Sequence, residues 1–307
     1  MATDEPLLLI AFNRPDDLAR LIDRLRDVAP SRVFVAVDGP REGNARDAET
    51  VARTHDAVSA IDWPCEVTTL FREENLGCGR AVSSAITWFL DHVERGIILE
   101  DDLLPDPSFF PYCTELLDRY ENDDRVLAVS GCNYVPPSAI SAHGAYRFSQ
   151  VPHIWGWATW RRSWTAYRLD ITGWRAALPF TRRWRAMGGS PASVAYWSTL
   201  FDLLARRQID TWDGQLVFAA MRTGMLTATP NVNLVENTGF GADATHTVRR
   251  PDYIRPVQSI ALPLAQVDVA IDESADRWTR RHVFEATIPG MARQAARYVR
   301  RRRGRSA

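Results

Sequence analysis

Three adjacent carboxylates, Glu100, Asp101 and Asp102, follow directly on the apolar run Ile97–Leu99. Neighbouring acids repel one another, so a fold keeps them together most readily where a cation or sugar hydroxyls take up the charge. An unbroken apolar run is typical of a strand buried on both faces of a parallel sheet, and ligands bind at the carboxyl ends of such strands. The run therefore predicts a ligand site. The alternative is an acidic loop, or first-turn acids of the helix that begins near Asp106.

Two earlier strands end in polar residues as well. The apolar segment Leu7–Phe12 stops at Asn13 and Arg14, and the segment Ser31–Val37 stops at Asp38. A helix is expected between them, because apolar residues recur at helical spacing after a proline suited to a first turn. These segments predict a β-α-β unit whose active edge carries the three polar residues.

A glycine-rich turn, Asn75–Arg80, leads into a helix expected to end near His92. Glycines let the backbone approach a ligand closely, and a helix N-terminus favours anionic groups. The turn is not a P-loop, because no G-K-[ST] follows, and Asn13–Pro15 is not the G-x-G-x-x-G of a dinucleotide fold. A turn of this kind does not by itself specify a ligand.

Tryptophan is concentrated in one region, since seven of the eleven lie within residues 155–197. Trp155 and Trp157 flank Gly156, and indole faces suit stacking on a sugar ring. Alternatively, the tryptophans from Trp157 to Trp164 recur at helical spacing and pack in the core.

Two later residues are further candidates for the site. Asp213 opens a helix expected to run to about Thr223, where an acid is most often an N-cap. His246 stands in the polar, glycine-rich loop Asn237–Thr247, among small residues that cannot bury it. That setting favours a ligand or phosphate role over a core role for the histidine.

In order and spacing these motifs resemble the metal-dependent GT-A glycosyltransferases, and within them the inverting N-acetylglucosaminyltransferase I type. The resemblance covers roughly residues 6–247. It runs through Ile10–Arg14, Val37-Asp38, Glu100–Leu103 with Pro107–Tyr112, Gly156-Trp157, Trp212-Asp213, and Gly239–Gly241 ahead of Thr245-His246. Residues 134–200 depart from the family's pattern. The membrane anchor and stem of the eukaryotic enzymes have no counterpart, as suits a soluble bacterial relative acting in polysaccharide biosynthesis.

The resemblance implies a GT-A fold, an α/β architecture with a mainly parallel central sheet and helices on both faces. It also implies inverting transfer of a hexose, N-acetylglucosamine by similarity, from a UDP donor to a hydroxyl of a glycan or lipid-linked acceptor. The resemblance implies that Arg14 and Asp38 bind the base and ribose, and that Glu100 and Asp101 bind the sugar and ribose hydroxyls. Asp102 would bind a Mn²⁺ or Mg²⁺ ion, and Asp213 would be the general base. The loop ending at His246 would close over the diphosphate. We also expect Asn13 and Arg80 at the donor, and Trp155, Trp157 and Trp212 at the acceptor.

Two other functions compete with this hypothesis. A sugar nucleotidyltransferase also handles nucleotide sugars with carboxylate-bound metal, but such enzymes usually place a glycine-rich phosphate loop after the first strand, where this chain has Asn13–Pro15. A non-catalytic carbohydrate-binding protein on the same scaffold would need neither the acidic triplet nor Trp212-Asp213.

Strands and helices alternate over about the first 130 residues, which predicts a mainly parallel sheet covered by helices on both faces. The remaining expected elements are strands at 65–70 and 126–130, helices at 46–60, 108–120, 160–167, 194–207 and 279–286, and a strand or linker at 260–269. We expect a catalytic domain at 1–250, with a nucleotide-sugar half (1–132) and an acceptor half (133–250), followed by an extension at 251–307.

Composition bounds the class of protein. The 307 residues are 46% hydrophobic, enough for one large core, and a net charge of −1 gives no field to recruit nucleic acid. The four cysteines are scattered, which suits reduced thiols in a cytoplasmic protein, and no apolar stretch reaches about 18 residues. The basic tail Arg293–Arg305 would either contact the inner face of a membrane peripherally or stay solvated.

Overall fold

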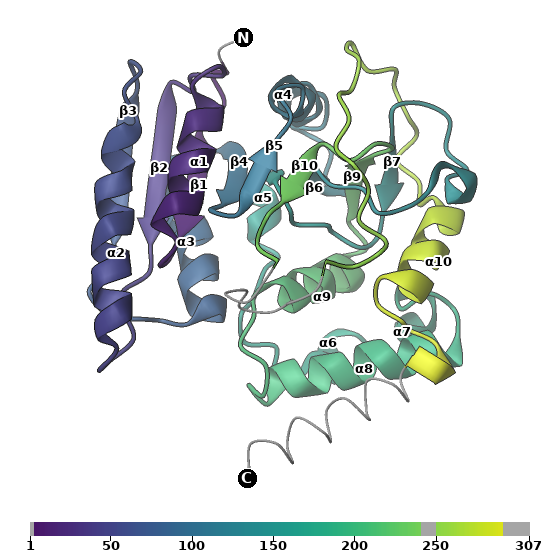
Figure 1. Cartoon of the computed structure of the whole chain (residues 1–307). Coiled ribbons are helices and arrows are strands. Elements are labelled where there is room, and N and C mark those ends of the chain that lie inside the picture. The colour runs from purple at the N-terminus through teal and green to yellow at the C-terminus, as the bar shows by residue number, and fades with distance from the viewer. Residues whose placement is uncertain (1–2, 241–249, 291–307) are drawn as a thin grey trace.

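The computed structural model describes residues 3–240 and 250–290, and it is organised around an eight-stranded sheet of order β3-β2-β1-β4-β8-β6-β9-β7 (Figure 1). The strands are β1 (Leu7–Ala11), β2 (Arg32–Val37), β3 (Glu66–Phe71), β4 (Arg95–Glu100), β6 (Val126–Ser130), β7 (Tyr146–Ser149), β8 (Trp157–Trp160) and β9 (Leu226–Pro230). Only β8 and β7 run against the others. The prediction of a mainly parallel α/β sheet is therefore confirmed.

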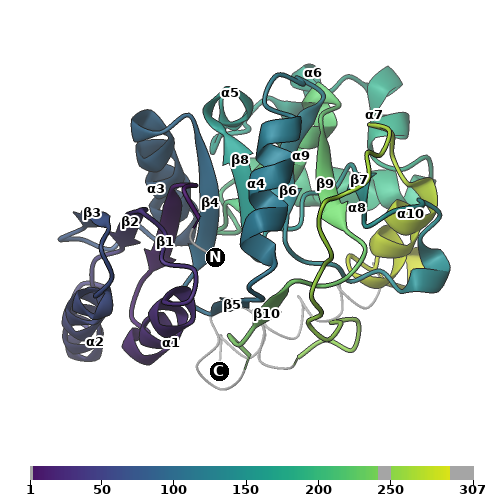
Figure 2. The same ribbon diagram turned by 90° about the horizontal axis from the view of Figure 1, so that it is seen from above.

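Helices cover both faces of this sheet. One face carries α1 (Pro15–Leu25), α2 (Ala45–Ala57) and α4 (Phe109–Arg119), and the other carries α3 (Cys78–His92), α5 (Arg161–Trp164) and α9 (Asp213–Thr223). Along β1 the side chains alternate: Leu7 and Leu9 pack with α1, whereas Leu8 and Ile10 pack with α3. Figure 2 shows α1 and α2 on one side of β1–β3 and α3 on the other.

A smaller core lies beyond α9, where α6 (Trp174–Ala177), α7 (Phe180–Ala186) and α8 (Pro191–Ala205) pack against its outer side. In Figure 1, α8 lies below α9. The segment after residue 250 also packs on the sheet. Its helix α10 (Glu273–His282) contacts the end of β7, where Asp276 Oδ1 accepts a hydrogen bond of 2.6 Å from Ser149 Oγ.

Local signals explain where several helices begin and end. Pro15 and Pro191 occupy first turns, where a missing amide proton costs nothing. The side chains of Asn44, Ser190 and Asp272 cap α2, α8 and α10, each accepting a backbone N–H of the first turn. The helices α2 and α8 lie close to the positions expected from the sequence, whereas the cap of α10 at Asp272 was not predicted and its start was placed too late.

The segment around Trp160 differs from the sequence prediction of a helix over 160–167. Trp157–Trp160 is strand β8, inserted between β4 and β6, and only Arg161–Trp164 is helical. The tryptophans recur at helical spacing, but they do not lie on one helix. They lie on a buried strand and on the short helix that follows it. Their core role is confirmed, since Trp160 and Trp164 are buried.

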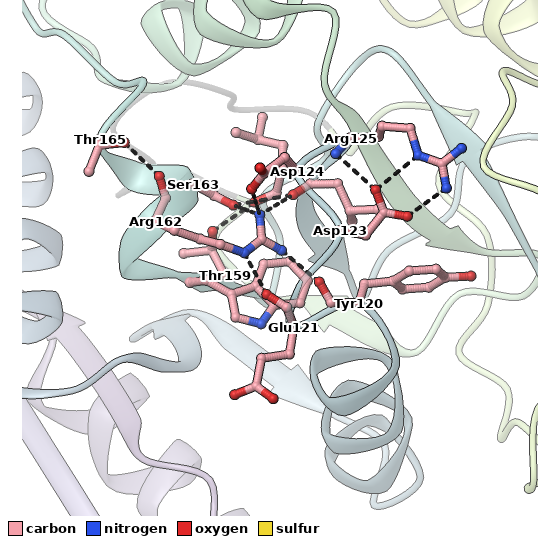
Figure 3. A network of polar contacts seen from close by, with 12 residues as sticks. Tyr120, Glu121, Asp123, Asp124, Arg125, Thr159, Arg162, Ser163 and Thr165 are labelled. Carbon is pink, nitrogen blue, oxygen red and sulfur yellow. Dashed lines mark hydrogen bonds and ion pairs between the residues drawn. The ribbon is translucent and has the colours of Figure 1, made fainter.

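A polar network holds β8 and α5 against the turn between α4 and β6 (Figure 3). Arg162 Nε donates to the Glu121 carbonyl (2.7 Å), and Nη2 donates to the Tyr120 carbonyl (2.6 Å). The guanidinium lies 4.5 Å from the Trp160 ring centroid. One arginine therefore satisfies turn carbonyls and covers the end of β8.

The later part of the chain holds most of the unpredicted structure. Strands β7 and β9, the strand pair β5 (Leu103–Pro105) with β10 (Val235–Asn237), and the short 3₁₀ turns η1 (Val58–Ala60) and η2 (Pro137–Ala139) complete the described elements. Residues 260–269 form neither helix nor strand, and α10 begins six residues before the helix expected at 279–286.

Candidate functional site

The ends of β2, β1 and β4 meet at one edge of the sheet and form one wall of a cavity of about 760 Å³. Ala11 pairs with Val37, and Ile10 pairs with Glu100, so the residues after these strands lie side by side. Of the residues expected at the site, Asn13, Arg14, Asp38, Glu100, Asp101, Asp102, Trp155, Trp212 and Asp213 line this cavity.

Among the described residues, the guanidinium of Arg14 pairs with the acidic triplet, and Arg41 also lines the cavity. Arg14 Nη1 lies 2.9 Å from Asp102 Oδ2 and 3.7 Å from Asp101 Oδ1. Burial, with the charges of Asp102, Asp101 and Asp213 added, raises the pKa of Glu100 to about 8. Burial and Asp102 likewise raise the pKa of Asp101 to about 7, although Arg14 opposes the shift. The site thus gathers more negative charge than Arg14 balances.

The loop after β10 packs onto Asp102. The Thr238 N–H donates to the Asp102 carbonyl (2.8 Å), and a side chain at Gly239 would lie 2.0 Å from Asp102 Oδ2. Any larger residue at this position would displace the Asp102 carboxylate. The loop therefore reaches the acidic triplet, whereas His246 and the rest of the loop lie outside the described residues.

The donor set suits a hard divalent cation only in part. Within residues 3–240 and 250–290, no group of three or more His, Cys, Asp or Glu side chains is arranged to hold an ion. Mg²⁺-type sites often use one or two carboxylates and take the remaining oxygens from substrate phosphates and water. Asp102, whose side chain is 17% exposed against 9% for Asp101, is the more open of the two aspartates. Asp102 therefore fits a cation shared with a diphosphate.

Asp38 is held by the turn before α3. Asn75 Nδ2 donates to Asp38 Oδ2 (2.9 Å), and the Leu76 N–H donates to Oδ1 (3.0 Å). Burial raises the pKa of this carboxyl, and the backbone hydrogen bonds oppose the shift. Asn13 is fixed in a similar way, because its Nδ2 donates to Asp47 Oδ1 at 3.0 Å.

The N-terminus of α3, expected to receive an anionic ligand, receives a carboxylate of the chain itself. The N–H groups of Cys78 and Gly79 donate to Asp210 Oδ2 (3.0 Å) and Oδ1 (2.9 Å). Arg80 is exposed and does not belong to the cavity wall, so the structure does not bring it to the proposed donor site. The N-terminus of α3 therefore binds a carboxylate, but this carboxylate belongs to Asp210 and not to a ligand.

Asp213 is the first residue of α9 rather than its N-cap, which is Trp212. The Thr211 hydroxyl and the Gly214 N–H (2.8 Å) both donate to Asp213 Oδ1. The Asp213 side chain is exposed at the cavity, and its charge contributes to the raised pKa of Glu100. The Asp213 carboxylate therefore lies close enough to Glu100 for the two to interact electrostatically.

The tryptophans divide between cavity and core. Trp155 is half-buried at the cavity and makes edge contacts with Tyr134 and Phe240 (centroids 5.2 and 5.8 Å). Trp157 is 2% exposed, stacks on Trp212 at 5.6 Å, and does not line the cavity. The interpretation of Trp157 as an acceptor platform is corrected accordingly, since its faces are covered by the core.

Several residues of the cavity wall were not predicted from the sequence. Asp210 and Thr211 directly precede Trp212 and Asp213, the two residues of this stretch that were expected at the site. Apolar and aromatic side chains also line the cavity, among them Ile154, Tyr196, Leu200, Ile209, Phe240 and Phe284. Tyr196 and Leu200, four residues apart on α8, offered the one readable signal, because that spacing places them on the same helix face.

No protein-family model and no curated protein matches the sequence. Among solved structures, the chain is similar to mouse xyloside xylosyltransferase 1 in its apo form (9% identity, 72% of this chain and 81% of that chain, TM-score 0.35). It is also similar to a UDP-glucose pyrophosphorylase complexed with UDP-glucose (9%, 74% and 89%, 0.35) and to HddC from Yersinia pseudotuberculosis (10%, 52% and 77%, 0.30). Such distant likenesses establish neither a family nor a reaction for this chain.

Proposed function

We propose that this protein is a metal-dependent inverting glycosyltransferase that moves a hexose from a nucleoside diphosphate donor to a hydroxyl of a glycan or lipid-linked acceptor. The observation that carries the proposal is a single cavity that brings together Glu100–Asp102, Arg14 and Asp38 from one half of the sheet with Asp213 from α9. A diol-binding acidic edge and a separate exposed carboxylate are the two parts that such a transfer requires.

The donor lies along the strand ends in this proposal. Asn13, Arg14 and Asp38 hold the base and ribose, and Glu100 and Asp101 accept hydrogen bonds from sugar and ribose hydroxyls. Asp102 would hold Mn²⁺ or Mg²⁺, and the ion would supply Lewis-acid stabilisation of the charge on the diphosphate leaving group. UDP as the nucleotide and N-acetylglucosamine as the sugar follow from the sequence resemblance.

Asp213 supplies the base in this mechanism. The acceptor oxygen forms a bond to the anomeric carbon while the bond from that carbon to the diphosphate oxygen breaks, and the hydroxyl proton passes to the Asp213 carboxylate. Because Oδ1 already accepts two hydrogen bonds, Oδ2 is the oxygen assigned to the proton. One displacement from the opposite side inverts the configuration.

The acceptor occupies the other side of the cavity. Trp155 and the largely buried Trp212 border it, and α8 contributes Tyr196 and Leu200. These side chains suit the apolar face of a sugar or a lipid-linked acceptor.

The basic tail lies outside the described residues, and peripheral contact of the tail with the inner face of a membrane remains part of the proposal. In the described part of the chain, no helix combines the length and apolarity needed to cross a bilayer.

The test is a product assay that separates three chemistries. We expect a thermal-shift screen of nucleotide sugars with and without Mn²⁺ to identify a donor, because a ligand of the native state raises apparent stability. With that donor and a panel of alkyl and aryl glycosides, nucleoside diphosphate and an inverted glycoside should form. Release of pyrophosphate from a nucleoside triphosphate and a sugar phosphate would instead identify a nucleotidyltransferase. Glycan binding without donor consumption would identify a carbohydrate-binding protein.

A further inference from the structure

The loop Asp210–Trp212, directly before Asp213, is attached to the molecule at each of its residues. Asp210 accepts hydrogen bonds from the first two N–H groups of α3, at 3.0 and 2.9 Å. The Thr211 hydroxyl donates to Asp213 itself. Trp212 stacks on Trp157 with ring centroids 5.6 Å apart, and its carbonyl accepts the Tyr167 hydroxyl. The loop is therefore held to α3 through Asp210 and to β8 through Trp212.

We propose that Asp210 is the positioning residue of Asp213, tying the loop that carries the base to the N-terminus of α3. The inference rests on the proposed role of Asp213. Asp210 does not contact the reacting atoms in this scheme; it sets where the Asp213 carboxylate stands relative to the strand ends that hold the donor.

The first turn of α3 is shaped to receive this carboxylate. A Cβ at Gly77 would lie 2.6 Å from Asp210 Oδ2, and a Cβ at Gly79 would lie 2.8 Å from Oδ1. The Gly79 position would also come within 2.9 Å of the Thr211 carbonyl, which is backbone and cannot rotate aside. The glycines that predicted a ligand approach therefore serve the approach of the Asp210–Thr211 loop.

The connection spans the two parts of the proposed reaction. Asp210 lies 132 residues beyond Cys78, and it joins α9 to a helix packed on β1 through Val82, Ile86 and other apolar residues. A carboxylate bound to two backbone N–H groups is a charge-assisted contact of restricted geometry. A base displaced by about 1 Å can cost about 10²-fold in rate, so this contact has the right scale to matter.

The test compares Asp210→Ala, Asp210→Asn and Gly79→Ala, using the nucleotide sugar that gives the largest thermal shift and following release of nucleoside diphosphate. We expect Asp210→Ala to lower kcat by about 10- to 100-fold, with a donor KM within about threefold of wild type. Asp210→Asn keeps one acceptor oxygen and should give an intermediate kcat. Gly79→Ala should lower kcat as well, because it displaces the loop while leaving Asp210 intact.

Two features separate positioning from loss of folding. Alanine is the better helix former, so Gly79→Ala has no helix-propensity reason to destabilise α3. If both changes act through one contact, the double variant should lose much less than the product of the two single losses. Asp170→Ala is the control: Asp170 also accepts a backbone N–H, from Thr172 at 2.8 Å, but it does not line the cavity, and its kcat should match wild type.

Failure of the inference differs from failure of the proposed function. Near-normal turnover of Asp213→Asn would overturn the role of Asp213 itself. If Asp213→Asn is inactive but Asp210→Ala and Gly79→Ala keep wild-type kcat, the positioning role is overturned and the base remains. An Asp210→Ala variant with raised donor KM and unchanged kcat would also overturn it, because the effect would then lie in donor binding.

Discussion

At the scale of single residues, the cavity separates two kinds of carboxylate. Burial, together with the charges of neighbouring carboxylates, raises the pKa of both Glu100 and Asp101. Asp213 is exposed, and its Oδ1 is held by the Thr211 hydroxyl and the Gly214 N–H. Crowded acids suit a cation or hydroxyl donors, whereas a solvated and oriented carboxylate suits proton acceptance. This difference in setting is the basis for assigning them different roles.

Asp213→Asn tests the base directly. An amide of the same shape can keep the hydrogen bonds of the loop but cannot take the acceptor proton. We expect kcat to fall by about 10²- to 10⁴-fold while donor affinity is retained. Steady-state kinetics with the identified donor, and calorimetric titration of the nucleoside diphosphate, measure the two quantities. Turnover close to wild type would contradict the assignment.

Asp102→Ala tests the cation site. Mn²⁺ shared between Asp102 and a diphosphate should lose a ligand in this variant, so the gain in UDP affinity that Mn²⁺ brings should fall by about tenfold or more, in keeping with the effects of losing charged contacts. Calorimetry of UDP with and without Mn²⁺ measures that gain. Asp56→Ala, an exposed acid near the end of α2, is the control and should leave it unchanged. An unaltered Mn²⁺ effect in Asp102→Ala would exclude the metal role.

At the scale of elements, the sequence predicted what local patterns determine. Leu7–Ala11 and Ile97–Leu99 are unbroken apolar runs followed by polar residues. The sequence therefore predicted both the strands and the polar residues at their ends. Strand β8 was not predicted, because four residues with tryptophans three apart match a helix equally well. Only pairing with β4 and β6 decides the conformation of that segment. The same holds for the site. The acidic triplet lies in one short stretch of sequence and was predicted, whereas the contact of Asp210 with Cys78 joins residues 132 positions apart and was not.

The attachment of β8 makes a prediction about stability. Arg162→Met keeps an unbranched apolar stem but leaves the Tyr120 and Glu121 carbonyls without their guanidinium donor. We expect the free energy of unfolding to fall by about 2 kcal/mol, since hydrogen bonds involving a charged group contribute about 1.5–3 kcal/mol. Urea denaturation followed by circular dichroism measures the change.

Arg125→Met is the matched control within the network of Figure 3. Its side chain is 67% exposed and pairs with Asp123, an exposed type of ion pair that contributes about 0–1 kcal/mol. Equal losses in the two variants would show that the Arg162 contacts do not anchor β8.

At the scale of the whole molecule, the continuous sheet joins the strand ends that carry the acids to the part that carries α9. The segment between β6 and β8 contains a buried histidine. His153 is 5% exposed, its Nε2 has no hydrogen-bond partner in the described structure, and its ring meets Tyr134 edge-on at 4.9 Å. Tyr134 in turn contacts Trp155 at the cavity. Protonation of this histidine would place an unpaired charge in the core.

Stability should therefore depend on pH through His153. Burial, with the charge of Arg147 added, lowers the pKa of His153 to about 3, whereas an unfolded histidine titrates near pH 6.5. Between pH 6.5 and pH 3 the unfolded chain binds a proton that the folded chain does not. The free energy of unfolding is therefore unaffected by this histidine above pH 6.5 and falls as the pH is lowered below that value. At pH 5 the loss from this group should reach about 2 kcal/mol relative to pH 7. Urea denaturation of wild type and of His153→Phe at pH 7 and pH 5 measures this contribution. Between the two pH values, the free energy of unfolding of wild type should fall by about 2 kcal/mol more than that of the variant, whatever the difference in stability between the two proteins at pH 7. His143→Phe, at an exposed histidine, should keep the wild-type difference, and a His153→Phe variant that also keeps it would show that this ring does not set the acid sensitivity of the fold.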